Sequence, residues 1–227
     1  GMDIGYRINE ALKVYGNIGY TYRIPTYTDL YYSDPTTIGD ENLDPEEAIA
    51  QELGLKYNRK NFSFSFALFN RDANNLIDYV KENEGDLWQA TNIVELNTKG
   101  FEVNANYTFK LGSFYQNINT AYNFLEDEIK DIDVNFSRYS INSLKHHVTS
   151  KLSTTFFNNI SQNIIYKYAE RTNGESYVVV DASINFKIKA FDFSIIANNI
   201  FNAAYTETNL VPMPKGNMLF GLIYNFK

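Results

Sequence analysis

Two segments decide the fold, L-K-V-Y-G-N-I-G-Y-T-Y-R at residues 12–23 and Q-E-L-G-L-K-Y at residues 51–57, and a long polar loop joins them. The first segment is rich in Tyr, Ile and Val, which favour extended structure. Pro25, Pro35 and Pro45 cannot donate a backbone hydrogen bond, so the chain must leave the sheet between the two segments. In the second segment apolar and polar side chains alternate, which predicts a strand with one apolar and one polar face.

The same alternation recurs along the whole chain and is clearest in F-S-F-S-F-A-L-F at residues 62–69. Residues 3–8 read as the end of an earlier strand, and no domain boundary is visible within residues 1–227. About ten strands are expected after residues 3–8, at residues 12–23, 48–57, 62–81, 92–109, 114–125, 146–157, 160–170, 176–188, 191–201 and 216–226.

The connections between these strands alternate in length. Short ones are expected at residues 58–61, 110–113, 158–159 and 189–190, and longer ones lie between them. In an up-and-down meander this order places every tight turn at one end of the strands and every long loop at the other. Such two-sidedness is typical of an antiparallel transmembrane β-barrel, whereas a β-sandwich would mix its loop lengths. The predicted fold class is therefore all-β.

The composition agrees with a barrel that meets lipid and water. Aromatic residues make up 16% of the chain, with 18 Tyr and 17 Phe, yet the mean hydropathy is −0.35. No apolar run approaches the roughly 20 residues that a membrane helix needs. The net charge of −7 argues against nucleic acid as a partner, and the absence of Cys excludes disulfides and thiolate metal sites.

The first residues suggest that the chain is a piece of a longer exported protein, because Gly1-Met2 leads directly into a strand-like segment. A piece cut from a barrel would expose two unpaired edge strands, which we expect at residues 12–23 and 218–226. We predict that these edges pair with each other into a smaller ring, or with a second copy of the chain.

Several segments, taken in order, resemble those of the TonB-dependent outer-membrane receptors. They are R-I-P-T-Y-T-D-L-Y from Arg23, G-D-E-N-L-D-P-E from Gly39, F-N-R-D-A-N-N-L-I-D-Y from Phe69, K-G-F-E-V from Lys99 and N-N-I-F-N-A-A-Y from Asn198. The last strand also ends in an aromatic residue, as in those receptors, although Lys227 follows it. The chain is similar to the C-terminal part of the receptor barrel, and the N-terminal plug and first strands of the family are absent.

The resemblance implies the last ten strands of a 22-stranded barrel in the bacterial cell outer membrane. The implied function is part of a transporter for energy-coupled uptake of a scarce, bulky nutrient such as an iron chelate or cobalamin, with no cofactor. The implied partners are outer-membrane lipid, the plug and remaining strands of the parent chain, a TonB-type energy-coupling protein that acts through the plug, and the nutrient ligand. Two alternatives are a complete small ten-stranded outer-membrane barrel that serves as an enzyme or adhesin, and a soluble β-barrel that binds a ligand.

Candidate ligand-binding residues lie in or beside the long loops. Aromatic side chains there could form the mouth that captures a ligand, and two arginines could assist with an anionic one. A girdle of Tyr and Trp at the membrane boundary is the alternative explanation for the aromatic residues. The candidates are Arg23, Tyr27, Tyr31, Tyr32, Trp88, Arg138 and Tyr139, with Phe136 beside them.

Polar residues on the strands are expected to face the barrel interior, where they could contact the plug or simply be hydrated. They are Glu52, Arg71, Glu102, Asn104, Asn119, Lys151, Lys167 and Asp181.

Catalysis and metal binding have little support in the sequence. His146 and His147 are adjacent, so on a strand they would face opposite ways, and a site built on Ser143 or Ser150 with one of them is the weaker interpretation. Acidic residues cluster at 40–47 and at 126–133, but without the spacing of a calcium loop. We interpret both clusters as solvated loops, and no catalytic or metal-binding residue is predicted.

Overall fold

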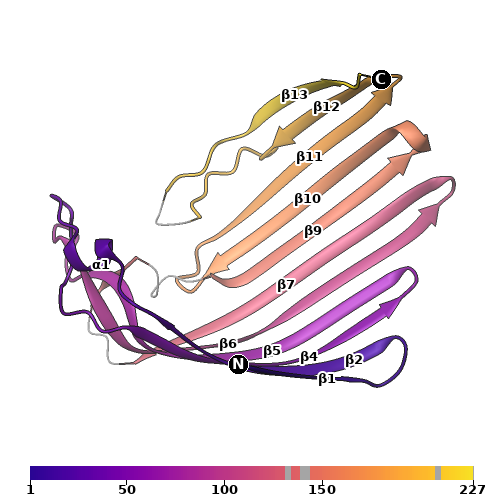
Figure 1. Ribbon diagram of the computed structural model, residues 1–227. Helices are drawn as coiled ribbons and strands as arrows, with labels where there is room; N and C mark the ends of the chain where they lie inside the picture. The colour runs from indigo at the N-terminus through magenta and orange to yellow at the C-terminus, as the bar shows by residue number, and fades with distance from the viewer. Residues whose placement is uncertain (131–133, 139–143, 208–210, 227) are drawn as a thin grey trace.

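The computed structural model describes residues 1–130, 134–138, 144–207 and 211–226, which form one curved sheet (Figure 1). Eleven strands follow one another in chain order, each antiparallel to the next. They are β1 (Met2–Arg7), β2 (Leu12–Arg23), β4 (Glu46–Arg59), β5 (Phe62–Lys81), β6 (Trp88–Leu111), β7 (Phe114–Lys130), β9 (Leu144–Phe156), β10 (Ile160–Arg171), β11 (Ser176–Ile188), β12 (Phe191–Asn198) and β13 (Asn217–Tyr224).

All ten expected strands are present, and residues 2–7 add a strand of their own. Most boundaries differ from the prediction by one or two residues, and three differ by more. β7 continues to Lys130, so residues 126–130, expected in a solvated acidic loop, belong to a strand. Trp88, expected in a loop, is the first residue of β6. β12 ends at Asn198 because Asn199 and Asn202 adopt positive φ angles of 47° and 55°, which a continuing strand cannot accommodate. Four short elements were not predicted, α1 (Tyr27–Tyr31), β3 (Thr37–Ile38), β8 (Phe136–Ser137) and the 3₁₀ turn η1 (Phe157–Asn159).

Tight turns and longer loops lie at opposite ends of the strands, as the alternating connection lengths predict (Figure 1). Positive φ angles at Gly112, Phe157 and Lys189 let three of the tight turns reverse the chain within two or three residues. The long loop before β4 carries α1 and β3, and the loop after β7 carries β8. All of the long-loop structure therefore gathers at one end of the sheet.

The register gives the sheet one apolar and one polar face. One row of directly paired residues crosses eight strands, and every member is apolar or aromatic. The row consists of Val14, Leu55, Phe66, Val103, Tyr122, Val148, Tyr168 and Val178. The neighbouring row on the opposite face is largely polar, with Lys13, Lys56, Ser65, Asn104, Ala121, Thr149, Lys167 and Val179.

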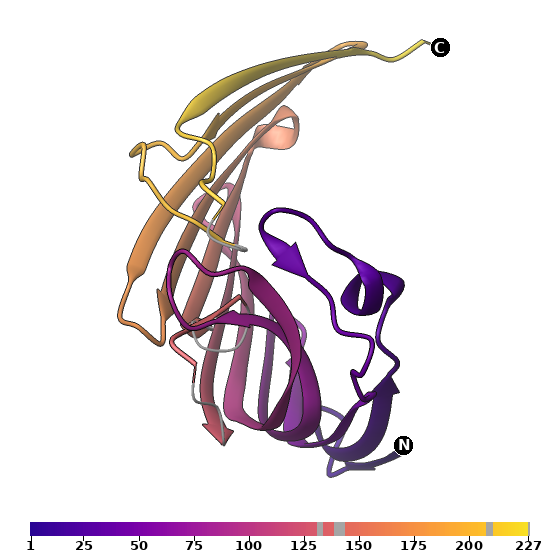
Figure 2. The same ribbon diagram turned by 90° about the vertical axis from the view of Figure 1, so that its left-hand side faces the viewer.

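The polar face is the concave one. Arg23 and Glu46 belong to it, since they lie an even number of residues from Lys13 and Lys56, and Arg23 binds Asp29 of α1. Figure 2 shows α1 and its loop on the concave side of the sheet. The apolar face is therefore convex and open, with Phe220 75% and Leu222 62% exposed. This confirms the predicted outward-apolar, inward-polar pattern of a membrane barrel wall.

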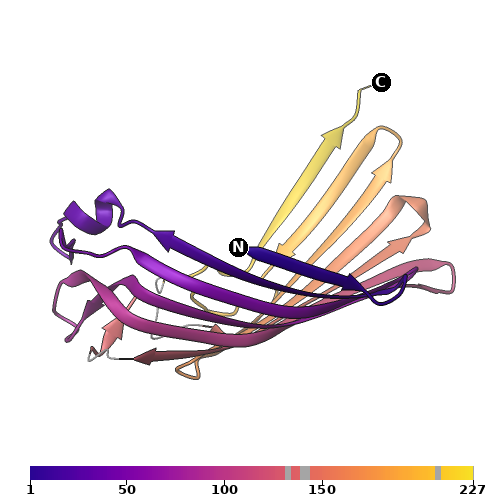
Figure 3. The same ribbon diagram turned by 60° about the horizontal axis from the view of Figure 1, so that its bottom comes forward.

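The prediction about the sheet edges is wrong in two respects. β2 is not an edge strand, because β1 pairs with its residues 13–18. β1 and β13 are the two ends of the sheet, and in the described part of the chain they do not pair with each other (Figures 2 and 3). Eleven strands with this curvature form an open arc rather than a closed ring. Pairing with a second copy stays a prediction.

Among the described residues no helix is long and apolar enough to span a membrane.

The two faces should respond differently to charge. Val103 lies on the convex apolar face of β6, and its neighbour Asn104 lies on the concave face. We expect Val103→Arg to lower the free energy of unfolding in lipid by about 2–4 kcal/mol, because the cation would sit in hydrocarbon. Asn104→Arg, the matched control, should change it by less than about 1 kcal/mol. Urea unfolding in lipid vesicles measures both, and equal losses would contradict the assignment of the faces.

Candidate functional site

The long-loop end of the sheet is built around the β5–β6 hairpin. We call residues 24–45, 75–92 and 134–138 the loop cluster. β3 comes from the loop before β4 and pairs with β6 at Trp88 and Gln89. β8 comes from the loop after β7 and pairs with β5 at Val80 and Lys81. Val80 and Gln89 pair with each other, so the two loops lie on opposite edges of the hairpin. Each loop crosses the hairpin: β3 comes from the β4 side and pairs with β6, and β8 comes from the β7 side and pairs with β5.

Asp29 is the central residue of the loop cluster. α1 begins after Thr26, whose hydroxyl accepts a hydrogen bond from the Asp29 N–H while its own N–H donates to the Asp29 carboxylate at 2.9 Å. This reciprocal capping fixes the start of the helix. The same carboxylate accepts from Arg23 Nη1 and from the Tyr79 hydroxyl, both at 3.1 Å. Asp29, only 8% exposed, thus connects β2, α1 and β5.

The strands on either side of the loop are tied by Arg23 and Glu46, which are paired in register. The guanidinium forms two hydrogen bonds with the carboxylate, Nε to Oε2 at 2.8 Å and Nη2 to Oε1 at 2.7 Å. Such two-point contacts are stronger and more directional than a single ion pair. Glu46 also accepts from the Ile77 N–H at 2.7 Å. The donors of Arg23 are therefore directed at carboxylates of the protein itself.

Carboxylates in this loop are held in their charged form. Burial disfavours the charged form of Asp29, but hydrogen bonds from Thr26, Arg23 and Tyr79 outweigh burial and keep its pKa below the ordinary value. Asp34 accepts hydrogen bonds from the backbone and hydroxyl of Thr36, and these contacts lower its pKa to about 2. Loss of either charge by acidification would release hydrogen bonds that hold the loop.

Arg138 joins the second loop to the first. Its guanidinium carbon lies 4.8 Å from the centre of the Trp88 ring and 5.1 Å from that of Tyr79. Its Nη2 donates to the Thr37 hydroxyl at 3.0 Å. Lys81 also approaches the Trp88 ring, with its Nζ 4.8 Å from the ring centre, and lies 5.6 Å from the centre of the Phe136 ring. Cation–π contacts of this kind contribute about 0.5–2 kcal/mol each.

Apolar packing completes the loop cluster. Leu43, Ile77, Tyr79 and Ala90 form a small buried core, with Leu30 and Trp88 packed against it. The loop needs a glycine at residue 39, because a Cβ there would lie 2.6 Å from the carbonyl oxygen of Asp29. The Gly39 N–H donates to the Tyr32 carbonyl at 2.7 Å. The return of the loop therefore passes directly against α1.

Two tyrosines of α1 remain open to solvent. Tyr27 is 79% and Tyr31 52% exposed, and their ring centres lie 5.1 Å apart. Tyr32 is also exposed and donates through its hydroxyl to Asp34 at 2.9 Å. An exposed aromatic pair on a short helix that the Asp29 contacts hold in place is a rigid platform on the concave side of the long-loop end.

The structure thus brings most of the predicted ligand-binding residues into one cluster but gives them different surroundings. Trp88 and Arg138 contact each other, Arg23 is paired with carboxylates, and Tyr27 and Tyr31 are exposed. Tyr139 lies outside the described residues. Their contacts with a ligand stay a prediction.

Sequence reasoning missed Asp29 and Tyr79. It placed Glu46 in a solvated acidic loop, which is wrong, because Glu46 begins β4 and its largely buried carboxylate binds Arg23. The pattern Thr26-Tyr27-Thr28-Asp29 after Pro25 is a helix-capping signal and could have indicated Asp29. Nothing local marks Tyr79, which lies 50 residues from its partner.

A second loop folds over the polar face near the C-terminus. The Asn199 N–H donates to the Asp181 carboxylate at 2.6 Å, which holds the start of this loop against β11. Lys167 of β10 forms an ion pair with Glu207, and the rings of Tyr177 and Tyr205 lie 4.6 Å apart. Lys167 and Asp181 share the concave face with the six other residues predicted to point inward, as the register shows. Contact with a plug stays a prediction.

The histidines lie on opposite faces of β9, as predicted. His146 accepts or donates a 2.8 Å hydrogen bond with the Tyr122 hydroxyl, and His147 pairs in register with Ala169 of the concave face. The Ser150 hydroxyl is bonded to Thr120 at 3.0 Å, and Ser143 lies outside the described residues. Within the described ranges no three His, Cys, Asp or Glu side chains gather as they would around a metal ion.

Comparison with known proteins places this geometry in a family. The family model described as TonB dependent receptor-like, beta-barrel, matches residues 3–203. The vitamin B12 transporter BtuB of Photobacterium profundum is 30% identical over 200 residues, which cover 86% of this chain and 30% of that protein. BtuB of Vibrio vulnificus is 21% identical over 219 residues, or 90% of this chain and 32% of that protein. The chain spans about a third of the length of these relatives.

Solved structures share the fold at lower identity. The copper transporter OprC superposes with a TM-score of 0.78 at 14% identity, over 99% of this chain and 39% of that one. The siderophore receptor PirA of Acinetobacter baumannii superposes with a TM-score of 0.73 at 15% identity, over 99% of this chain and 40% of that one. The FrpB iron transporter of Neisseria meningitidis superposes with a TM-score of 0.70 at 18% identity, over 99% of this chain and 39% of that one. The sheet is therefore similar to part of each of these larger barrels.

The loop cluster should loosen in acid. The pKa of Asp29 is lower in the folded protein than its unfolded value of about 3.9, so its contribution to stability is complete above about pH 4 and is lost as the pH falls through the folded pKa. Asp34 acts in the same direction. Fluorescence of Trp88, the single tryptophan, should be constant from about pH 7 to 5 and change below about pH 4.

The matched variant for this titration is Asp29→Asn, which should already show the altered Trp88 signal at pH 7, with a loss of about 1.5–3 kcal/mol in local stability. Asp192→Asn, at the tight-turn end, should titrate like the wild type. An identical pH profile for Asp29→Asn and the wild type would contradict the central role of Asp29.

Removing Arg138 should expose Trp88. Arg138→Ala deletes the cation over both rings and the hydrogen bond to Thr37, so we expect acrylamide to quench Trp88 more strongly, with a local loss of about 1–2 kcal/mol. Arg59→Ala at the opposite end of the sheet is the control and should leave quenching unchanged. Equal quenching of Arg138→Ala and the wild type would show that Arg138 does not shield the indole.

Proposed function

Because this chain belongs to the TonB-dependent receptor-like β-barrel family, we propose that it forms part of the wall of a bacterial outer-membrane transporter. In this proposal the transporter takes up a scarce, bulky nutrient, such as an iron chelate or cobalamin, with energy supplied from the inner membrane. The observation that carries the proposal is the two-faced open sheet with its loops gathered at one end. A convex apolar face suits lipid, and a concave polar face suits a hydrated interior.

The loops supply the binding surface in this proposal. Tyr27 and Tyr31 present two adjacent rings to solvent, and aromatic side chains bury large area at low entropic cost when a ligand stacks on them. Asp29 holds the helix that carries both rings, and Arg138 holds the second loop against the first. The tyrosines would make the first contact with the nutrient, while Asp29 and Arg138 act as positioning residues.

The proposed nutrients are those of similar proteins. The curated relatives are vitamin B12 transporters, and the structural neighbours include an iron transporter and a siderophore receptor. Energy coupling through a plug and a TonB-type protein belongs to the same proposal. It would require the plug and the remaining strands, which lie outside this chain.

Uptake by cells that carry the intact transporter tests the proposal, with radiolabelled cobalamin and ferric enterobactin as probes. For the probe that is transported, Tyr27→Ala with Tyr31→Ala should raise the half-saturation concentration about tenfold, the equivalent of about 1.4 kcal/mol of lost binding. Tyr115→Ala, an exposed tyrosine at the tight-turn end, is the control and should have no effect. Uptake should stop when the proton-motive force is dissipated.

If the intact wild-type protein transports neither cobalamin nor ferric enterobactin, the proposed nutrient class is overturned. Uptake that continues without a proton-motive force would overturn energy coupling.

A further inference from the structure

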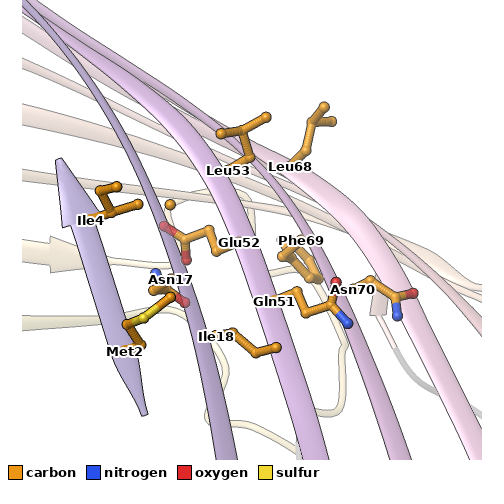
Figure 4. Close-up of a pocket in the computed structure, with 11 residues that line it drawn as sticks. Met2, Ile4, Asn17, Ile18, Gln51, Glu52, Leu53, Leu68, Phe69 and Asn70 are labelled. Atoms are coloured by element: carbon orange, nitrogen blue, oxygen red, sulfur yellow. The ribbon is translucent and has the colours of Figure 1, made fainter. Parts of the chain in front are cut away.

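A groove of about 520 Å³ opens on the convex face where β1, β2, β4 and β5 lie side by side (Figure 4). The register explains its position. Gly16 of β2 is paired with Ile4 of β1 on one side and with Leu53 of β4 on the other. Because Gly16 has no side chain, the apolar face is indented between Ile4 and Leu53. Leu68 of β5, paired with Leu53, extends the same wall.

One end of the groove is polar. Gln51 and Asn70 pair with each other one row beyond Leu53 and Leu68, and both line the groove. The same row continues into Lys99 of β6 and Glu126 of β7, which form an ion pair at 3.4 Å. On β4 to β7 this row is therefore polar, whereas on β1 and β2 it stays apolar with Met2 and Ile18, which also line the groove. Among the convex-face residues that line the groove, only Gln51 and Asn70 are polar.

We propose that this groove binds one acyl chain of a membrane lipid, with the carboxamides of Gln51 and Asn70 beside the polar end of that chain. The proposal rests on the proposed membrane location. The groove is continuous with the convex apolar face, which runs without interruption from β2 to β11 in the row of Val14.

The side chains that line the groove favour a lipid over a charged peptide. The convex-face residues among them are uncharged, and Glu52 belongs to the opposite face by its register. Asn70 is oriented by its neighbours, since its amide donates to Asp72 at 2.8 Å and its carbonyl accepts from Asn97 at 3.0 Å. Gln51 is exposed and adds amide donors for an ester oxygen.

The energy of this contact would come from packing. A lipid tail is already in hydrocarbon, so the hydrophobic effect contributes little, and close contact between the chain and the groove walls supplies the stabilisation. A side chain placed at Gly16 should therefore compete directly with the lipid. There is room for one, because a Cβ on Gly16 would lie 3.4 Å from the carbonyl oxygen of Glu52, 3.8 Å from Leu53 and 3.9 Å from Ile4, which are contact distances without a clash.

Native mass spectrometry of the intact protein tests the proposal, after detergent exchange in the presence of dioleoyl phosphatidylethanolamine. We expect the wild type to retain one more phospholipid than Gly16→Leu. Gly19→Leu is the matched control, since Gly19 lies on the same strand but the opposite face, with no atom within 4 Å of its added Cβ. It should retain lipid like the wild type. Gln51→Leu should still bind the lipid, but the detergent concentration that removes the lipid should be lower than for the wild type.

Equal lipid retention in the wild type and Gly16→Leu, or equal loss in Gly16→Leu and Gly19→Leu, would overturn the groove as a lipid site. A retained mass that matches a peptide instead of phospholipid would do the same. The fraction of wild-type protein recovered in the membrane distinguishes failure of the groove proposal from failure of the proposed function. If the wild type is soluble without detergent, both proposals fail, whereas a membrane-embedded wild type with unchanged lipid retention overturns the groove alone.

Discussion

The structure depends on a backbone constraint, that each strand must satisfy its hydrogen bonds through its neighbours while its two faces meet different environments. In lipid no water replaces a missing partner, so pairing must be continuous across the apolar part of the wall. A slip of one residue in any pair would move apolar side chains to the polar face, as the row from Val14 to Val178 makes clear. Alternation therefore specifies the strands, their register and the curvature of the sheet together.

This constraint explains why the strands were predictable and the loops were not. Period-two alternation is a local signal, and all ten predicted strands are present with small changes at their ends. Trp88 was expected in a loop, yet pairing of Gln89 with Val80 draws it into β6. α1, β3 and β8 are short, and their stability comes from contacts that their own sequences do not reveal.

The structure explains what several residues do in the segments that resemble the receptor family. Arg23 and Glu46, from two different segments, are joined in register and by two hydrogen bonds. Gly39 allows the loop to pass close to Asp29. Asn199 turns the chain with a positive φ and bonds its carboxamide to the backbone of Ala203. By contrast, the pairing of Asp29 with Tyr79 could not be inferred, because a tyrosine near the end of an alternating strand carries no sign of a distant partner.

The crossed arrangement of β3 and β8 imposes an order on assembly. Thr37 and Arg138 meet across 101 residues of chain, and each arrives at an edge that exists only once β5 and β6 have paired. The hairpin is thus a template on which both loops can condense only after β5 and β6 have paired. Contacts between residues this far apart in the sequence form slowly, because the entropy of closing the loop opposes them. The surface at this end of the wall would consequently be the last to mature and, on local unfolding, the first to be lost.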